Sequence, residues 1–162
     1  MWGMIATWRM ALEGIQKVTP ILSQEGIAGD AIEGAIKEVE DFPYFKSVGY
    51  GGLPNEKMEV ELDAAYLDGS RFDFGAVFAI KNFANPISIA RELSHYKVNN
   101  VLVGQGAQEF ARSRHFEEKE MLTDRAKIHY HNRLKDLEQE QLSPYAGHDT
   151  VGMVALDTHG DM

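Results

Sequence analysis

The fold is decided near the end of the chain, by the stretch Gly147-His148-Asp149-Thr150-Val151-Gly152-Met153-Val154-Ala155-Leu156-Asp157. An apolar run begins here at a threonine, directly after a polar segment that contains Ser143 and Pro144. Apolar residues occupy both alternating sets of positions, which predicts a buried strand over residues 150–157. A hydroxyl group therefore stands at the first position of a buried strand, immediately after a loop.

Thr150 has two interpretations. β-branched residues suit strands, so on these residues alone an ordinary strand start is the favoured interpretation. The second interpretation requires that the peptide bond before Thr150 is cut. The freed α-amine then lies within reach of the threonine's own hydroxyl and can act as the general base, which makes the hydroxyl a potent nucleophile.

Size and composition indicate one globular domain with a real core. The chain has 162 residues, of which 44% are hydrophobic and 25% charged. A net charge of -9 argues against nucleic acid or an anionic membrane as a partner. The absence of cysteine excludes disulfides, thiolate metal sites and a cysteine nucleophile. No apolar run approaches the roughly 20 residues of a membrane span. No signal peptide is visible either, so we expect a cytoplasmic protein.

The first third of the chain predicts a strand followed by two helices. Residues 4–8 form a short apolar run, which we expect to be a central strand ending at Trp8. Helical spacing over residues 12–26 predicts a helix that Thr19-Pro20 kinks or ends early. A second, amphipathic helix follows, with Asp30 as its N-cap.

The middle of the chain predicts a hairpin and a helix. Alternation over residues 58–64 indicates a half-buried strand, and Asp68-Gly69 is a hairpin turn signal. Residues 72–80 are the partner strand, expected to place Phe72, Phe74, Phe78 and Ile80 on one face. Asn85-Pro86 then starts a helix, with Asn85 as its cap. Strands and helices in mixed order, with an antiparallel hairpin among them, are typical of an α+β fold.

The remaining segments are less decisive. Residues 42–55 form a glycine-rich connection, for which tight turns and a functional loop are both open interpretations. A strand at 100–103 leads through Gly104-Gln105-Gly106 into a helix, but the third glycine of a dinucleotide loop is absent. His129 and His131 are two residues apart and make a poor metal site. Residues 117–141 are highly charged and predict an exposed helix. We expect no metal and no cofactor.

Five ordered blocks carry a resemblance to one family. They are EDFPYFKSVGYGGLPN (40–55), ELDAAYLDG (61–69), FGAVFAIKNFANPISIAREL (74–93), NVLVGQGAQEFA (100–111) and HDTVGMVALD (148–157). Together they resemble glycosylasparaginase, of the asparaginase-2 family of N-terminal nucleophile hydrolases. The match runs from about residue 5 to the last residue and is weakest between residues 117 and 144.

The resemblance implies a chemistry for Thr150. In that family the precursor cuts itself before the threonine of the HDT triplet, so His148 and Asp149 would belong to the self-cleavage site. The Thr150 hydroxyl would attack the carbonyl of Asp149, and water would hydrolyse the resulting ester. A strained backbone there would favour this step. The mature Thr150 would attack the side-chain amide of a substituted asparagine, and water would then release aspartate.

The resemblance also implies a substrate-binding residue. A Thr-Trp pair lines the family's substrate pocket, and Thr7-Trp8 matches that pair. We therefore expect Trp8 to bind substrate. The family's aromatic residue two positions later is Met10 here, which changes the shape of this wall. The loop at residues 42–55 would lie close to the same active site.

For the fold, the resemblance implies half of a four-layer αββα sandwich. Residues 1–149 would be the α-subunit portion, and residues 150–162 the first strand of a β-subunit whose remainder is absent. That absent half would carry the oxyanion donors and the clamp for the substrate's α-carboxylate. We therefore expect the 162-residue chain alone to be inactive. Its partners would be a small glyco-asparagine or β-aspartyl substrate, the missing β half, and a second αβ unit in a homodimer.

Two alternative functions stay open. One is the related isoaspartyl peptidase/L-asparaginase, and the other is a non-catalytic, truncated remnant. His148-Asp149, Ser47-Val48-Gly49-Tyr50-Gly51-Gly52 and Asn85-Pro86-Ile87-Ser88 look more like the glycosylasparaginase branch. The leading expectation is therefore hydrolysis of N4-glycosylated asparagine.

Overall fold

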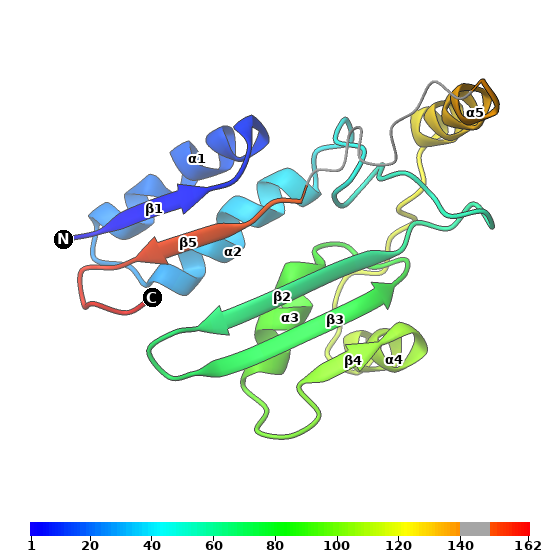
Figure 1. Cartoon of the computed structure of the whole chain (residues 1–162). Coiled ribbons are helices and arrows are strands. Elements are labelled where there is room, and N and C mark those ends of the chain that lie inside the picture. Colours follow the sequence, from blue (N-terminus) through cyan, green and yellow to red (C-terminus); the bar gives the residue numbers. More distant parts are fainter. Residues whose placement is uncertain (140–149) are drawn as a thin grey trace.

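Helices α1 to α4 lie on one side of the two sheets, and α5 lies apart from them (Figure 1). The computed structural model describes residues 1–139 and 150–162. Within them, two small sheets face one way and helices cover their other face, which confirms the predicted α+β class. The elements in chain order are β1 (Gly3–Ala6), the 3₁₀ turn η1 (Arg9–Ala11), α1 (Leu12–Ser23), α2 (Ala28–Glu40), β2 (Leu62–Asp68), β3 (Asp73–Ile80), α3 (Pro86–Ser94), β4 (Val101–Val103), α4 (Gly104–Ser113), α5 (Asp124–Glu138) and β5 (Met153–Leu156).

The two sheets differ in how the chain builds them. β1 and β5 pair antiparallel although they come from opposite ends of the chain, with Gly3 opposite Leu156 and Ala6 opposite Met153. β2 and β3 form the predicted antiparallel hairpin, and β4 adds to β3 in parallel. The Asp68 carboxylate fixes the hairpin turn by accepting hydrogen bonds from the next amides, those of Ser70 and Arg71.

One hydrophobic core lies behind each sheet. Behind β2 and β3, helices α3 and α4 bury a cluster that includes Val77, Ile80, Phe83, Ile89, Leu93, Ala107 and Ala111. Behind β5, helices α1 and α2 bury Val18, Leu22, Ala28, Ala31, Ile32, Ala35, Ile36 and Ala155. Ile87 of α3 packs into this second core, and Tyr66 of β2 contacts both. The two sheets are therefore held together through their helices.

Proline does not end α1 where the sequence predicts. Of the two outcomes expected at Thr19-Pro20, a kink or an early end, the early end is wrong, since α1 continues through Pro20 to Ser23. Val18 and Leu22 are buried on both sides of the proline, and the amide of Gln24 donates to the Pro20 carbonyl at 3.0 Å. Burial of the last turn outweighs the one backbone bond that proline removes.

The predicted cap of α2 is also wrong. Asp30 lies in the first turn of α2, after the start at Ala28. The N-terminus is capped from a distance instead, because the amide of Ala28 donates to the Asp157 carboxylate at 3.0 Å. The other oxygen of Asp157 accepts from the amides of His159 and Asp161. A residue at the end of β5 therefore fixes the start of α2.

Two strand predictions need correction. β2 begins at Leu62, so most of residues 58–64 lies before the strand. Phe74 and Phe78 are exposed, but Ile80 is fully buried and does not share their face. Ala79 has φ 50°, and the β2–β3 register shifts between Leu62 and Ala64. This irregularity turns the end of β3 over and sends Ile80 into the core.

The remaining elements follow the sequence more closely. The short strand at 100–103 and the helix after it are confirmed as β4 and α4, and the charged segment contains the largely exposed helix α5. The strand expected over 150–157 is shorter, from Met153 to Leu156, and Val154 is exposed. Burial on both faces is therefore not seen within the described residues. None of the helices described is long and apolar enough to cross a membrane.

Candidate active site

Thr150 lies where β1 finishes and β5 is about to begin. β1 ends at Ala6, and the next residue, Thr7, continues the contact with the opposite segment. The amide of Thr7 donates to the Gly152 carbonyl at 2.9 Å. The Thr7 hydroxyl donates to the Thr150 carbonyl at 3.0 Å and accepts from the Gly152 amide at 2.8 Å. The backbone of Thr150 is thus attached to the end of β1.

Thr150 lines two neighbouring cavities. One, of about 410 Å³, lies among the loop at 47–49, the start of β2 and the first turn of α3. The other, of about 510 Å³, lies between the loop at 52–56 and α5. Ser47 lines both cavities together with Thr150. The glycine-rich connection at 42–55 therefore forms a wall beside the threonine, which favours the functional interpretation of that loop.

A buried glutamate, Glu40, holds this wall in place. It is the last residue of α2, its side chain is 3% exposed, and it lines the smaller cavity. One carboxyl oxygen accepts the amide of Ile87 at the start of α3 at 3.2 Å, and the other accepts the Asn85 side-chain amide at 3.4 Å. Its backbone carbonyl accepts the amide of Tyr50 at 2.7 Å. Glu40 therefore joins α2, the wall loop and α3.

Close packing explains one glycine of that loop. Gly49 has φ 61°, and a Cβ atom there would lie 2.1 Å from the Glu40 carbonyl oxygen. Any side chain at position 49 would push the loop away from α2. The loop can approach Glu40 this closely only because residue 49 is glycine.

Burial raises the pKa of Glu40 to about 8, even though its hydrogen bonds with Ile87 and Asn85 act in the opposite direction. At neutral pH the carboxyl is therefore largely uncharged. Two further acids, Glu61 and Asp63, line the same cavity. Glu61 pairs with Lys81 at 3.1 Å, and Asp63 accepts the amide of Ala79 at 2.7 Å. The smaller cavity therefore holds three acids, of which Glu40 is largely neutral and Glu61 is paired with a lysine.

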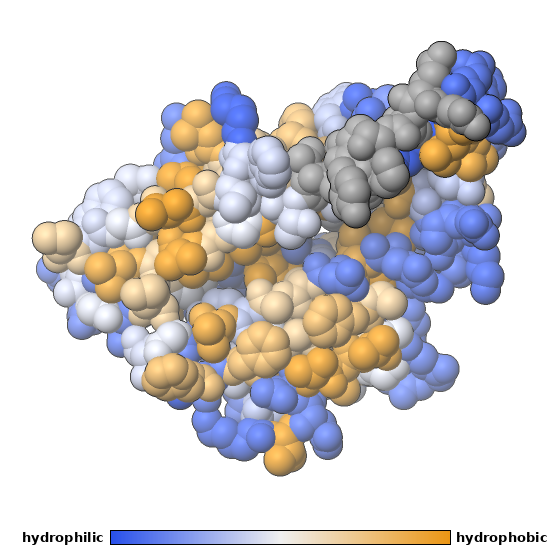
Figure 2. All heavy atoms as spheres, in the orientation of Figure 1, coloured by the Kyte–Doolittle hydropathy of each residue, from blue (hydrophilic) through white to orange (hydrophobic). Residues whose placement is uncertain are grey.

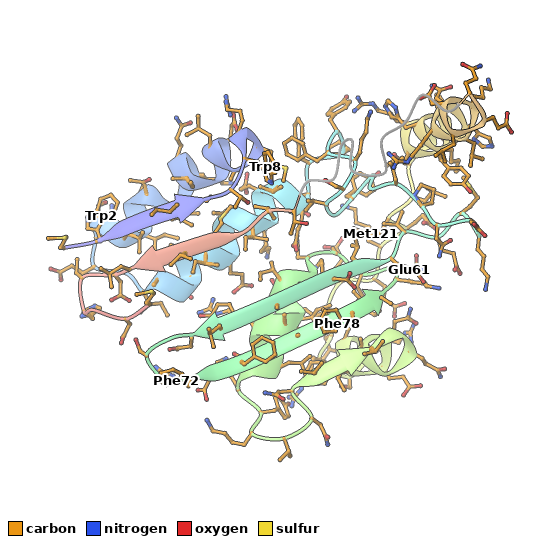
Figure 3. The ribbon with its side chains drawn as sticks, in the orientation of Figure 1. Trp2, Trp8, Glu61, Phe72, Phe78 and Met121 are labelled. Carbon is orange, nitrogen blue, oxygen red and sulfur yellow. The ribbon has the colours of Figure 1, made fainter. Side chains whose placement is uncertain are left out.

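Trp8 adopts an unusual backbone conformation next to Thr7. Its φ of 64° and ψ of 152° fall in a region that is essentially restricted to glycine. The chain turns there from β1 into η1, and the indole is 60% exposed at the end of β1 (Figure 3). Trp8 lies at the same end of the β1–β5 pair as Thr150, but it is not among the residues lining the two cavities beside that threonine.

The structure brings together some of the predicted site residues and leaves others aside. Thr7 and Thr150 are in contact, and Trp8 is the neighbour of Thr7. His148 and Asp149, the expected self-cleavage residues, lie outside the described residues. Among the described residues, no group of three or more His, Cys, Asp or Glu side chains is arranged to hold a metal ion.

Sequence reasoning missed Glu40 and the tether formed by Thr7. A signal for Glu40 was present, because Ile32, Ile36 and Glu40 follow one another at steps of four along the apolar face of α2. An ionisable residue on a buried stripe indicates a special role. No local pattern indicates the Thr7 tether, since it joins residues 143 apart in the chain.

With this geometry in view, comparison with known proteins identifies the family. The chain belongs to the asparaginase-2 family, described as Asparaginase, whose family model matches residues 6–162. The resemblance seen in the sequence is thereby confirmed.

Several curated proteins of this family are similar to the chain. The N(4)-(Beta-N-acetylglucosaminyl)-L-asparaginase of Elizabethkingia miricola is 36% identical over 158 residues, which cover 98% of this chain and 46% of that protein. The isoaspartyl peptidase/L-asparaginase of Xenopus laevis is 35% identical over 161 residues, covering 97% and 52%. The human protein of the same name is 35% identical over 145 residues, covering 88% and 47%. The chain spans about half the length of these relatives.

The raised pKa of Glu40 predicts a pH-dependent stability. Its folded-state pKa of about 8 lies above the ordinary value of 4.5, so the folded protein binds this proton more tightly. The stabilisation is complete below about pH 4.5 and is lost as the pH rises to about 8. Glu40→Gln stays uncharged and escapes this loss. Relative to that of the wild type, the unfolding free energy of the variant should rise by on the order of several kcal/mol between pH 5 and pH 9, measured by denaturant unfolding.

The control for Glu40 is Glu117→Gln, because Glu117 is exposed. The unfolding free energy of Glu117→Gln should differ from that of the wild type by the same amount at pH 5 and at pH 9. An unchanged difference in unfolding free energy between wild type and Glu40→Gln at pH 5 and pH 9 would contradict the assignment.

The backbone of Trp8 predicts an inverted order of stability for alanine and glycine. Both Trp8→Ala and Trp8→Gly remove the indole, but only glycine adopts φ 64° without strain. We expect Trp8→Gly to be more stable than Trp8→Ala by about 1–3 kcal/mol in thermal unfolding. At Ile5, an exposed position inside β1, the same two substitutions should show the usual order, with alanine more stable. Equal stabilities at position 8 would argue against strain there.

Proposed function

We propose that this chain is the first half of an amidohydrolase precursor, and that Thr150 becomes its N-terminal nucleophile. The observation that carries the proposal is the placement of Thr150. This threonine lies on two cavities, beside the loop at 47–52, and its backbone is tied to the strand end that carries Thr7 and Trp8. Membership of the asparaginase-2 family over residues 6–162 supports this assignment.

The proposed maturation is a self-cleavage between Asp149 and Thr150. The Thr150 hydroxyl attacks the carbonyl carbon of Asp149, and the acyl group moves from the threonine nitrogen to its oxygen. Water then hydrolyses the ester, which frees the Asp149 carboxylate, the Thr150 hydroxyl and the Thr150 α-amine. Those two threonine groups are the nucleophile and the general base of an N-terminal threonine hydrolase.

In the mature enzyme, the proposed reaction hydrolyses the side-chain amide of N4-glycosylated asparagine. The α-amine of Thr150 accepts the proton of its hydroxyl, the oxygen attacks the amide carbonyl, and the proton goes to the departing amine. Water then hydrolyses the acyl-enzyme and releases aspartate. We assign Trp8 to substrate binding, because it follows Thr7 at the same strand end as Thr150.

The uncovered faces of both sheets support a second half. Exposed apolar side chains gather over β1, β5, β2 and β3 on the side away from the helices (Figure 2). They include Ile5, Leu67, Phe74, Phe78 and Val154. We propose that a further sheet with its own helices covers this face, which would complete a four-layer αββα sandwich. That half would supply the oxyanion donors, worth roughly 10²–10³ in rate, so residues 1–162 alone would be inactive.

The remaining elements of the proposal concern the whole protein. The chain covers about half of the length of its relatives, which supports a division into an α-subunit portion, residues 1–149, and a β-subunit that starts at Thr150. We further propose a homodimer of such αβ units in the cytoplasm, working without a cofactor.

A second candidate function is hydrolysis of β-aspartyl peptides. Relatives at 35% identity are named isoaspartyl peptidase/L-asparaginase, so identity alone does not separate the two activities. The two candidates share the nucleophile and differ in the group released from the aspartyl carbonyl. A non-catalytic remnant that folds only by association is the third candidate, and it predicts an uncut, aggregating chain without amide turnover.

Replacing Thr150 tests the proposal in the full-length protein. Thr150→Ala removes the nucleophile and should abolish both self-cleavage and aspartate release, while Thr150→Ser keeps a hydroxyl and should retain part of each. Thr19→Ala, a change within α1 away from Thr150, should leave both unchanged. The measurement is aspartate released from N-acetylglucosaminyl-asparagine and from a β-aspartyl dipeptide.

The two substrates decide among the candidates. Preference for the glycosylated amide supports the leading function, and preference for the dipeptide transfers the assignment to the second. Normal aspartate release by Thr150→Ala would refute the role of Thr150 altogether, and an uncut, aggregating wild type would support the remnant.

A further inference from the structure

The contact between β1 and β5 continues beyond the last backbone pair, Ala6 with Met153. At the next step the Thr7 amide donates to the Gly152 carbonyl, and the Thr7 side chain makes the remaining contacts with residues 150–152. The Thr7 hydroxyl accepts the amide of Gly152 at 2.8 Å and donates to the carbonyl of Thr150 at 3.0 Å. One hydroxyl thus satisfies two backbone groups at once, as only a group that is both donor and acceptor can.

Geometry explains why a hydroxyl is needed here. Residues two apart in an extended segment direct their polar groups the same way, so Thr150 and Gly152 both face β1. The backbone of β1 supplies one of their partners, because the Thr7 amide donates to the Gly152 carbonyl at 2.9 Å, but Trp8 then turns the chain into η1 with φ 64°. The Thr7 side chain takes the place of the missing backbone pair.

We propose that Thr7 is a positioning residue for the Thr150 nucleophile, holding its carbonyl so that its hydroxyl and α-amine stay at the cavity. This inference rests on the proposed function. Once the bond before Thr150 is cut, the residue is a chain end, and chain ends fray unless they are tied down. The tether reaches Thr150 from β1 and does not involve the residues before the cleavage site, so it can persist in the mature enzyme.

The size of the effect follows from how sensitive catalysis is to position. A displacement of about 1 Å at a reacting group can lower the rate about 10²-fold. Thr7→Val keeps the shape and loses the hydroxyl, so kcat should fall about 10–100-fold. KM should stay within about threefold, because the substrate-binding groups are untouched. Thr7→Ser restores the hydroxyl and should recover kcat to within a few-fold of the wild type.

A second measurement reports the tether itself. Hydrogen exchange of the Gly152 amide should be slow in the wild type and in Thr7→Ser, and clearly faster in Thr7→Val, because its acceptor is lost. Thr19→Val is the matched control. It also removes a threonine hydroxyl, one that donates to the Ile15 carbonyl within α1, and should change neither kcat nor Gly152 exchange.

The outcomes separate this inference from the proposed function. Full-length protein is used throughout. Thr150 is the attacking residue both in self-cleavage and in substrate hydrolysis. Slow self-cleavage of Thr7→Val at an unchanged thermal midpoint therefore supports the inference, just as a lowered kcat does. A kcat of Thr7→Val equal to that of the wild type, or a loss that Thr7→Ser does not recover, overturns the positioning role while the function stands. No turnover by the wild type refutes the proposed function, and this role with it, whatever the exchange shows.

Discussion

The structure depends on the antiparallel pairing of β1 with β5, two strands from opposite ends of the chain. This pairing places β5 against α2, buries Ala155 among the side chains of α1 and α2, and lets Asp157 cap the start of α2. Where the backbone ladder stops, the Thr7 hydroxyl extends it to Thr150. The position of the proposed nucleophile is thus fixed by the same contact that closes the fold.

The wall facing Thr150 depends on a different constraint, the cost of burying an acid. Glu40 ends α2 inside the protein, where an uncompensated charge would be strongly unfavourable. Its carboxyl is kept largely neutral and accepts hydrogen bonds from the first turn of α3, and its carbonyl accepts the amide of Tyr50 in the wall loop. Two helices and one loop therefore meet at a single residue, and Gly49 lets them approach closely.

Periodicity and turn chemistry predict most elements of this fold, because those signals are local. The hairpin at Asp68, the start of α3 at Asn85 and the apolar face of α2 all follow from such patterns. Predictions failed where a distant residue decided the outcome: Asp157 caps α2 from 129 positions away, and core packing carries α1 past Pro20. For the site, local chemistry did not decide whether Thr150 is a nucleophile or an ordinary strand start, and the family resemblance of five sequence blocks favoured the nucleophile. The Thr7 tether needed the structure.

The central claim is that Thr150 becomes the first residue of a new chain. Intact-mass analysis of the freshly purified full-length protein tests it most directly, with Thr150→Ala purified in parallel. We expect two fragments, one ending at Asp149 and one whose N-terminal residue is Thr150, and a single uncut chain for Thr150→Ala. An active wild type that remains uncut, or that is cut elsewhere, would contradict it.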